Sequence, residues 1–383
     1  MKSLQLIPSS LTVCRSIFAI LLLGLELPVP AAKAQTGNTA TGNAALVSVT
    51  TGDYNTADGL QALNKDTVGS FNTGVGVNAL YSNTGGVYNT STGFQALFTN
   101  TIGIHNTATG AQALYSNNGD FNTATGVNAL YNNTIAKSNT ANGHEALFLN
   151  TTGGQNTALG ANALHDNNAF FNTAEGVFAL SHNTSGSDNT ANGAYALTNS
   201  TTGFYNTASG SKALRANTTG SDNTADGFSA LVTNSGGSHN TASGVAALNA
   251  NVQGDDNTAA GFQALFNTTG SNNLALGSGA GSGLTTGSNN IAIGAQGAAG
   301  ESNTIRIGKP GVQKTFVQGI FGKPVANGVQ VMANAAGKLG TVASSARFKE
   351  QIEPMDQGSK ALFSLRPVTF RYKPEFDPDG IPQ

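Results

Sequence analysis

The stretch that decides the fold is Asn206-Thr-Ala-Ser-Gly-Ser-Lys-Ala-Leu-Arg-Ala-Asn-Thr-Thr-Gly-Ser-Asp222, one complete copy of a 17-residue unit. Counted from the first Asn, position 3 of the unit is Ala, position 9 is Leu, and positions 5 and 15 are Gly. The unit recurs in steps of 17 residues, with occasional steps of 16 and a last step of 13, which predicts a repeat architecture. Its leading Asn recurs at Asn38, Asn55, Asn72, Asn89, Asn106, Asn122, Asn139, Asn156, Asn172, Asn189, Asn206, Asn223, Asn240, Asn257, Asn273, Asn290 and Asn303.

This unit suits short strands better than helices. A helical-hairpin repeat needs about 30 residues or more, and Gly, Asn and Thr are poor helix formers. We therefore predict short strands centred on Thr-Ala and on Ala-Leu, with Ala and Leu inside and Gly at corners that need a positive φ. The Asn side chains are expected to form hydrogen-bonded ladders along the stack.

One unit cannot fold alone. Burying one Leu and two Ala gives about 3–4 kcal/mol, whereas ordering each residue of the unit costs about 1 kcal/mol or more. Stacking of coils is therefore obligatory, and about 15 coils at roughly 4.8 Å each would extend about 70 Å. We predict an all-β fold, a parallel β-solenoid or β-roll over residues 35–304. Because its core is thin, we expect a homotrimer.

Composition excludes several classes of function. Only 10% of the residues are charged and the formal net charge is -2, so no phosphate-neutralising surface and no nucleic-acid partner is expected. The single cysteine, Cys14, excludes a disulfide framework and a cysteine-based zinc site. The histidines do not all share one unit position, so we expect no metal site and no cofactor. These histidines are His105, His144, His165, His182 and His239.

Residues 1–34 have the pattern of a secretory signal peptide. Lys2 and Arg15 flank the N-terminal side of an apolar run at residues 16–25, and Ala32-Lys-Ala34 is a small-x-small cleavage site. The apolar run is too short to span a bilayer comfortably. We expect a secreted or cell-surface protein whose mature chain has no membrane span; an uncleaved N-terminal anchor is the alternative.

Aromatic residues recur at two unit positions, which favours a structural stripe or a subunit contact over a platform for sugar stacking. One set follows the Leu, at Tyr81, Phe98, Tyr115, Tyr131, Phe148 and Phe266. The other set precedes the next Asn, at Phe71, Tyr88, Phe121, Phe171 and Tyr205. In later units Arg215, Asn249, Asp222 and Asp256 take these places.

Over residues 38–304 the repeat resembles the head repeats of trimeric autotransporter adhesins and related phage tail-fibre shafts. The resemblance implies a left-handed, trimeric β-roll with a surface glycan or a host receptor as its partner. The composition then changes. Residues 305–343 lose the repeat but keep alternating apolar positions punctuated by Gly, so we expect a β-rich neck. Residues 344–383 predict a short helix followed by a strand, the start of an α+β domain.

Three motifs in this last segment carry a second resemblance. They are Ser344-Ser-Ala-Arg-Phe-Lys-Glu-Gln-Ile, Pro354-Met, and Leu365-Arg-Pro-Val-Thr-Phe-Arg-Tyr-Lys. Together they resemble the intramolecular chaperone, auto-processing domain of phage tailspikes and endosialidases, in which a Ser-x-x-Arg-x-Lys motif is the self-cleavage site. The resemblance implies catalytic roles for Ser344, Arg347 and Lys349 and cleavage of the bond between Ala343 and Ser344. Because the family domain extends further, residues 344–383 are expected to be a truncated form of it.

The chemistry of this motif is reasonable in itself. A serine hydroxyl becomes a good nucleophile when a base removes its proton, and a lysine is such a base when its pKa falls toward neutrality. The arginine would supply a neighbouring cation or hold the oxyanion.

The first hypothesis is therefore an exported fibrous shaft, adhesin-like or tail-fibre-like, whose C-terminal segment promotes trimer assembly. A second is a Ser-Lys endopeptidase that cleaves itself once. A third is a solenoid that binds glycans or ice through its Asn, Thr and aromatic faces.

Overall fold

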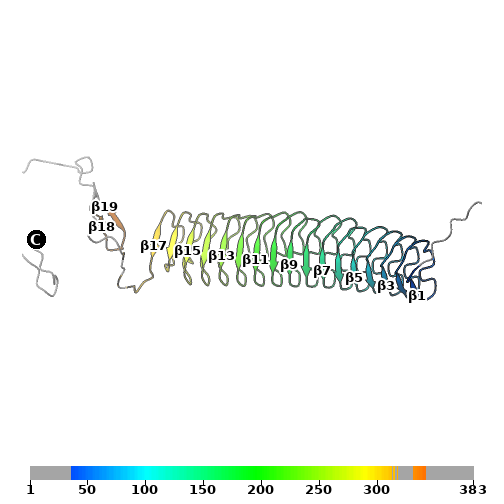
Figure 1. Cartoon of the computed structure of the whole chain (residues 1–383). Coiled ribbons are helices and arrows are strands. Elements are labelled where there is room, and N and C mark those ends of the chain that lie inside the picture. The colour runs from blue at the N-terminus through cyan, green and yellow to red at the C-terminus, as the bar shows by residue number, and fades with distance from the viewer. Residues whose placement is uncertain (1–35, 313, 315–316, 318–330, 342–383) are drawn as a thin grey trace, which may run out of the picture. The chain divides into compact units, whose positions relative to one another are not determined.

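The computed structural model describes residues 36–312, 314, 317 and 331–341, and this part of the chain is all-β. The chain divides into two units at residue 312. The first unit is a stack of coils that confirms the predicted parallel β-solenoid (Figure 1). Each coil contributes one three-residue strand, and each strand pairs in parallel and in register with the strand of the next coil, so that Thr190 lies opposite Thr207.

The strands of the solenoid occupy positions 2 to 4 of successive units; in the last coil Thr304, and not the predicted Asn303, takes position 1, because its amide donates to Asn290 Oδ1 at 3.1 Å. The strands are β1 (Thr39–Thr41), β2 (Thr56–Asp58), β3 (Thr73–Val75), β4 (Thr90–Thr92), β5 (Thr107–Thr109), β6 (Thr123–Thr125), β7 (Thr140–Asn142), β8 (Thr157–Leu159), β9 (Thr173–Glu175), β10 (Thr190–Asn192), β11 (Thr207–Ser209), β12 (Thr224–Asp226), β13 (Thr241–Ser243), β14 (Thr258–Ala260), β15 (Leu274–Leu276), β16 (Ile291–Ile293) and β17 (Ile305–Ile307). The last of these strands, β17, lies in the segment expected as the neck.

The core consists of the Ala at positions 3 and 8 and the Leu at position 9, as predicted. In the coil that begins at Asn139, Ala141, Ala146 and Leu147 are all fully buried. The same three positions form one continuous cluster along the solenoid. Each coil therefore buries its own Leu against the coils on both sides.

The predicted second strand at Ala-Leu is wrong. Glu145 and Leu147 both have a φ of 54°, in the left-handed region, so this segment is a turn. The amide of Glu145 donates to Val127 O of the preceding coil at 3.0 Å, and that of Leu147 donates to Ala163 O of the following coil at 3.0 Å. The left-handed residues thus turn their amides alternately to the coil before and the coil after, and these bonds offset the backbone strain.

The Asn at position 1 forms the expected ladder. The backbone amide of Asn240 donates to Asn223 Oδ1 at 3.0 Å, and its side-chain Nδ2 donates to Gly254 O at 2.8 Å. Equivalent bonds run without interruption from Asn38 to Thr304. These Asn side chains are buried between the ends of the ladder, so they satisfy the turn and are not exposed to a ligand.

The two glycines of the unit have different roles. Gly244, at position 5, has a φ of 138°, which confirms the predicted corner. Gly237, at position 15, lacks a positive φ; instead, it has no room for a side chain. A Cβ at Gly237 would lie 2.5 Å from Asn234 Oδ1 and would also meet the carbonyl oxygen of Gly254.

The solenoid ends at a charged cap. Arg306 in β17 takes the unit position that holds a buried Ala in the coils before it, and its Nε donates to Glu301 Oε1 at 2.9 Å and Oε2 at 2.8 Å. This bond holds the pKa of Glu301 below its usual range. In the second unit, β18 (Val331–Ala333) and β19 (Leu339–Thr341) form an antiparallel hairpin.

The neighbouring glycines 236 and 237 provide a matched test of this packing. We expect Gly237→Ala to destabilise the solenoid by about 1–3 kcal/mol, because the new methyl group has no space. A Cβ at Gly236 meets only Thr219 Oγ1, at 3.5 Å, so Gly236→Ala should be neutral or up to about 1 kcal/mol stabilising. Denaturant unfolding followed by circular dichroism measures both; equal effects would contradict the packing account.

Candidate functional site

The residues predicted to be catalytic, Ser344, Arg347 and Lys349, lie outside the described residues. The described residues place four features along the solenoid: two stacks of aromatic rings, a hollow at the end of one stack, a polar edge, and a buried carboxyl group in an Asn ladder.

The aromatic residues form two stacks along the coils. The first stack, at position 17, has neighbouring ring centroids 4.9–5.2 Å apart, and the second stack, at position 10, has them 4.9–5.4 Å apart. The first stack is Tyr54, Phe71, Tyr88, His105 and Phe121. The second stack is Tyr81, Phe98, Tyr115, Tyr131, Phe148 and His165.

Three members of these stacks were absent from the predicted sets. Tyr54, His105 and His165 occupy the same unit positions as the predicted aromatics, so an alignment of the units would have identified them. Three predicted members lie outside the two stacks. Phe171 contacts Phe170 and Tyr205 contacts Phe204, and Phe266 follows a coil that has Asn249 at the same unit position.

Stacking decides what these rings can bind. Within each stack the planes lie within 28° of parallel, so each ring covers the face of its neighbour and presents its edge outward. A sugar packs its C–H groups on the electron-rich face of an aromatic ring. The interior of a stack therefore offers no sugar platform, which favours the predicted structural stripe.

The second stack ends in a hollow. After His165, the next coil has the small Ser181 at position 10, so the far face of the imidazole is not covered by another ring. The hollow has a volume of about 210 Å³ and is lined by Asn162, His165, Asp166, Phe178, Ser181 and His182. His165 Nδ1 lies 2.5 Å from Asp166 Oδ1, and Ser181 Oγ lies 3.1 Å from His182 Nδ1. Polar groups and aromatic rings thus converge at one place.

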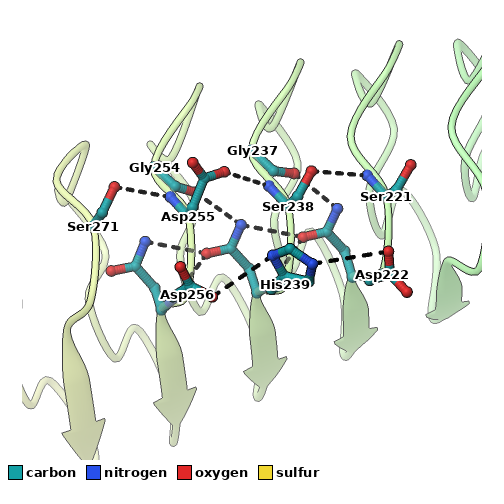
Figure 2. Close-up of polar contacts among 12 residues, drawn as sticks. Ser221, Asp222, Gly237, Ser238, His239, Gly254, Asp255, Asp256 and Ser271 are labelled. Atoms are coloured by element: carbon teal, nitrogen blue, oxygen red, sulfur yellow. Dashed lines mark hydrogen bonds and ion pairs between the residues drawn. The ribbon is translucent and has the colours of Figure 1, made fainter.

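Toward the C-terminal end of the solenoid a polar edge replaces the first stack (Figure 2). At position 17, His239 lies between Asp222 and Asp256, with its Nε2 4.0 Å from Asp222 Oδ2 and its Nδ1 3.6 Å from Asp256 Oδ1. At position 16, the amide of Ser238 donates to Asp255 Oδ1 at 2.7 Å, and the amide of Asp255 donates to Ser271 Oγ at 3.0 Å. These side chains bond coil to coil, which is a structural role.

The threonines at position 2 form an exposed column, but the ice-binding alternative needs paired columns. Position 4 carries Thr in β1, β4, β5 and β6, whereas it carries Asp58 in β2, Leu159 in β8 and Glu175 in β9. Paired threonines therefore occur only in short runs, and the regular two-column array that favours ice binding does not form in the described strands.

A second Asn ladder, at position 12, has two interruptions. Asn234 Nδ2 donates to Asn217 Oδ1 of the preceding coil at 2.9 Å, and this pattern holds in most coils. Where Ser200 and Thr268 replace Asn, the preceding ladder oxygens, Asn183 Oδ1 and Asn251 Oδ1, are buried without a hydrogen-bond donor. These positions are weak points in the stack.

The first member of this ladder is a buried carboxyl group, Asp66, because the preceding coil has Val49 at position 12. Its Oδ1 accepts from the amide of Gly69 at 3.0 Å and from Asn83 Nδ2 at 3.3 Å, whereas its Oδ2 is buried without a partner. Burial raises the pKa of Asp66 to about 7, despite these hydrogen bonds.

The stability of the solenoid should therefore depend on pH through Asp66. Because its pKa in the folded protein lies above the ordinary value of 3.8, ionisation opposes folding, and stability should fall as the pH rises from about 4 to about 7. Asp66→Asn should remove this loss and raise stability at pH 8 by a few kcal/mol. Thermal unfolding between pH 4 and pH 8 measures the effect, with Asp58→Asn on the exposed strand face as the control. A wild-type pH profile in Asp66→Asn would contradict it.

The described part of the chain contains no cluster of three or more His, Cys, Asp or Glu residues that could hold a metal ion. It also contains no helix with the length and apolar character that a membrane crossing requires.

The described residues thus define a parallel β-solenoid, and the comparison with protein families adds the character of the C-terminal segment. Residues 344–382 match the family described as the chaperone of endosialidase. The match begins at Ser344 and includes Arg347 and Lys349. Comparison with curated proteins gives no match, and comparison with solved structures gives none either.

Proposed function

We propose that this protein is an exported fibrous shaft whose C-terminal segment assembles three chains and then cleaves itself at the bond between Ala343 and Ser344. The observation that carries the proposal is the joint presence of a uniform β-solenoid and a segment, residues 344–382, similar to the chaperone of endosialidase. The signal-like residues 1–34 support export, and the likeness of the repeats to adhesin heads and tail-fibre shafts supports a role in attachment.

The cleavage uses the serine that follows the scissile bond. Lys349 takes the proton from Ser344 Oγ, which attacks the carbonyl carbon of Ala343 and forms an ester as the C–N bond breaks. Arg347 stabilises the oxyanion of the tetrahedral intermediate, and the proton held by Lys349 passes to the departing amine of Ser344. Water then hydrolyses the ester, which leaves a carboxylate on Ala343 and restores the Ser344 hydroxyl. Each chain reacts once.

The test is the denatured mass of the purified full-length protein. We expect wild type to give two fragments that meet at Ala343 and Ser344, and Ser344→Ala and Lys349→Arg to remain uncut. Ser345→Ala is the matched control, because it removes the adjacent hydroxyl and should leave cleavage intact. An uncut wild-type chain would overturn self-cleavage, and a cut Ser344→Ala chain would assign the cut to another protease.

A second candidate function, glycan binding, is favoured by the hollow next to Ser181. Here an aromatic stack ends with an open ring face, and the carboxylate of Asp166 and the amide of Asn162 are acceptors and donors for sugar hydroxyl groups. Its volume of about 210 Å³ is below that of pockets that enclose a whole small ligand, so the hollow would hold one unit of a longer sugar chain that runs over the surface.

Immobilised neutral and acidic oligosaccharides provide the probe for this candidate. We expect Ser181→Phe to extend the second stack, fill the hollow and reduce binding at least tenfold; Asp166→Ala should weaken binding similarly. Asp188→Ala, an exposed residue outside the hollow, is the control. Binding that persists in Ser181→Phe but is lost on mutating Tyr115 or Tyr131 would move the site to the stack itself.

A further inference from the structure

The outward face of the strands changes character at β15. Strands β1 to β14 each begin with an outward Thr, but the last three strands read Leu-Ala-Leu, Ile-Ala-Ile and Ile-Arg-Ile. Their first and third residues form two parallel columns, referred to as the apolar columns. The apolar columns are Leu274, Leu276, Ile291, Ile293, Ile305 and Ile307.

These side chains are not part of the solenoid core. The middle residues Ala275 and Ala292 remain buried, as in the other coils, while Leu276 is 53% exposed, Ile305 66% and Ile307 67%. Threonine has high strand propensity too, and it serves at the first outward position in every earlier coil, so the strand itself does not require Leu or Ile. A contiguous exposed apolar patch of this kind marks an interaction surface.

The apolar columns also lack charge. Earlier strands carry Asp58, Glu175 and Asp226 on the same outward face. In β17 the one charged residue, Arg306, lies between the two outward Ile and is paired with Glu301: its Nη2 donates to Oε1 at 2.7 Å and its Nε to Oε2 at 2.8 Å. Identical copies that meet through the apolar columns would therefore bring no like charges together, whereas copies that meet through β2, β9 or β12 would.

We propose that the apolar columns are the surface through which three copies of this chain pack against one another. This inference rests on the trimer of the proposed function and assigns its contact within the solenoid. The chaperone-like segment, residues 344–382, follows the last coils in the chain after residues 308–343, so chains held together by that segment bring these coils together first. The polar Thr columns of the earlier coils then leave the rest of each shaft free to face water.

The first test restores the polar pattern. The triple variant Ile293→Thr, Ile305→Thr, Ile307→Thr should dissociate at protein concentrations at least tenfold higher than wild type does, measured by sedimentation equilibrium on the full chain. The control changes the third strand residue, the position of Ile293 and Ile307, in two earlier coils, with Val75→Thr and Leu159→Thr, and should remain trimeric. A triple variant as trimeric as wild type would overturn the assignment while leaving the proposed trimer intact. A monomeric wild-type chain would overturn the trimer itself.

Cross-linking provides a second test that does not depend on weakening the fold. In a Cys14→Ser background, Ile305→Cys should form a disulfide between copies under mild oxidation, visible as a covalent dimer on a non-reducing gel. Thr207→Cys, on the same face in β11, should not. Equal cross-linking at both positions would place the contact along the whole shaft. If the triple variant of the first test melts at a lower temperature but keeps the wild-type assembly mass in solution, the apolar columns are covered by the chain's own residues. Either result overturns the proposal.

Discussion

The structure depends on the requirement that every buried polar group in a narrow coil has a partner. A coil with only Ala and Leu inside buries little apolar surface, so an unsatisfied amide or carbonyl would cancel much of its gain. The Asn at position 1 meets this requirement both as a hydrogen-bond acceptor and as a donor. Asn106 accepts from the amide of Asn122 through Oδ1 at 3.0 Å and donates through Nδ2 to Gly119 O at 2.8 Å, which closes its own turn.

That ladder also explains where the unit can change length. The coil from Asn106 to Asn122 is one residue shorter than the usual unit, and the missing residue belongs to the turn between Asn117 and Gly119. Both ladder bonds of Asn106 are kept, because the carbonyl of Gly119 in the shortened turn still reaches the Asn106 side chain. A deletion within positions 1 to 9 would instead shift the strand register and remove the buried Ala and Leu from the core.

Most of the core could be predicted from the repeat, whereas the turn at Leu147 and the hollow beside Ser181 depend on backbone and side-chain geometry. The inward Ala and Leu, the Asn ladders and the corner Gly could be predicted, because each recurs where only one chemical environment is available. The turn at Leu147 could not, since Leu rarely adopts a left-handed φ and no local residue signals it. The hollow beside Ser181 was missed for another reason: it lies between side chains of two coils, and His165 had not been recognised as the last ring of the stack.

A uniform interior with a varied exterior has consequences for assembly. Since each coil is stabilised mainly by its neighbours, folding can begin wherever a few coils are held together and then spread along the stack. On the proposed scheme that place is the C-terminal end, where the apolar columns lie and where the chaperone-like segment follows in the chain. Coils added toward the N-terminus need only their own ladders, so their outward positions are free to carry rings, hydroxyl groups or charges without affecting the fold. Cleavage after assembly would then remove the segment that starts the process, so a shaft that unfolded could not refold by the same route and its persistence would be set by its unfolding rate.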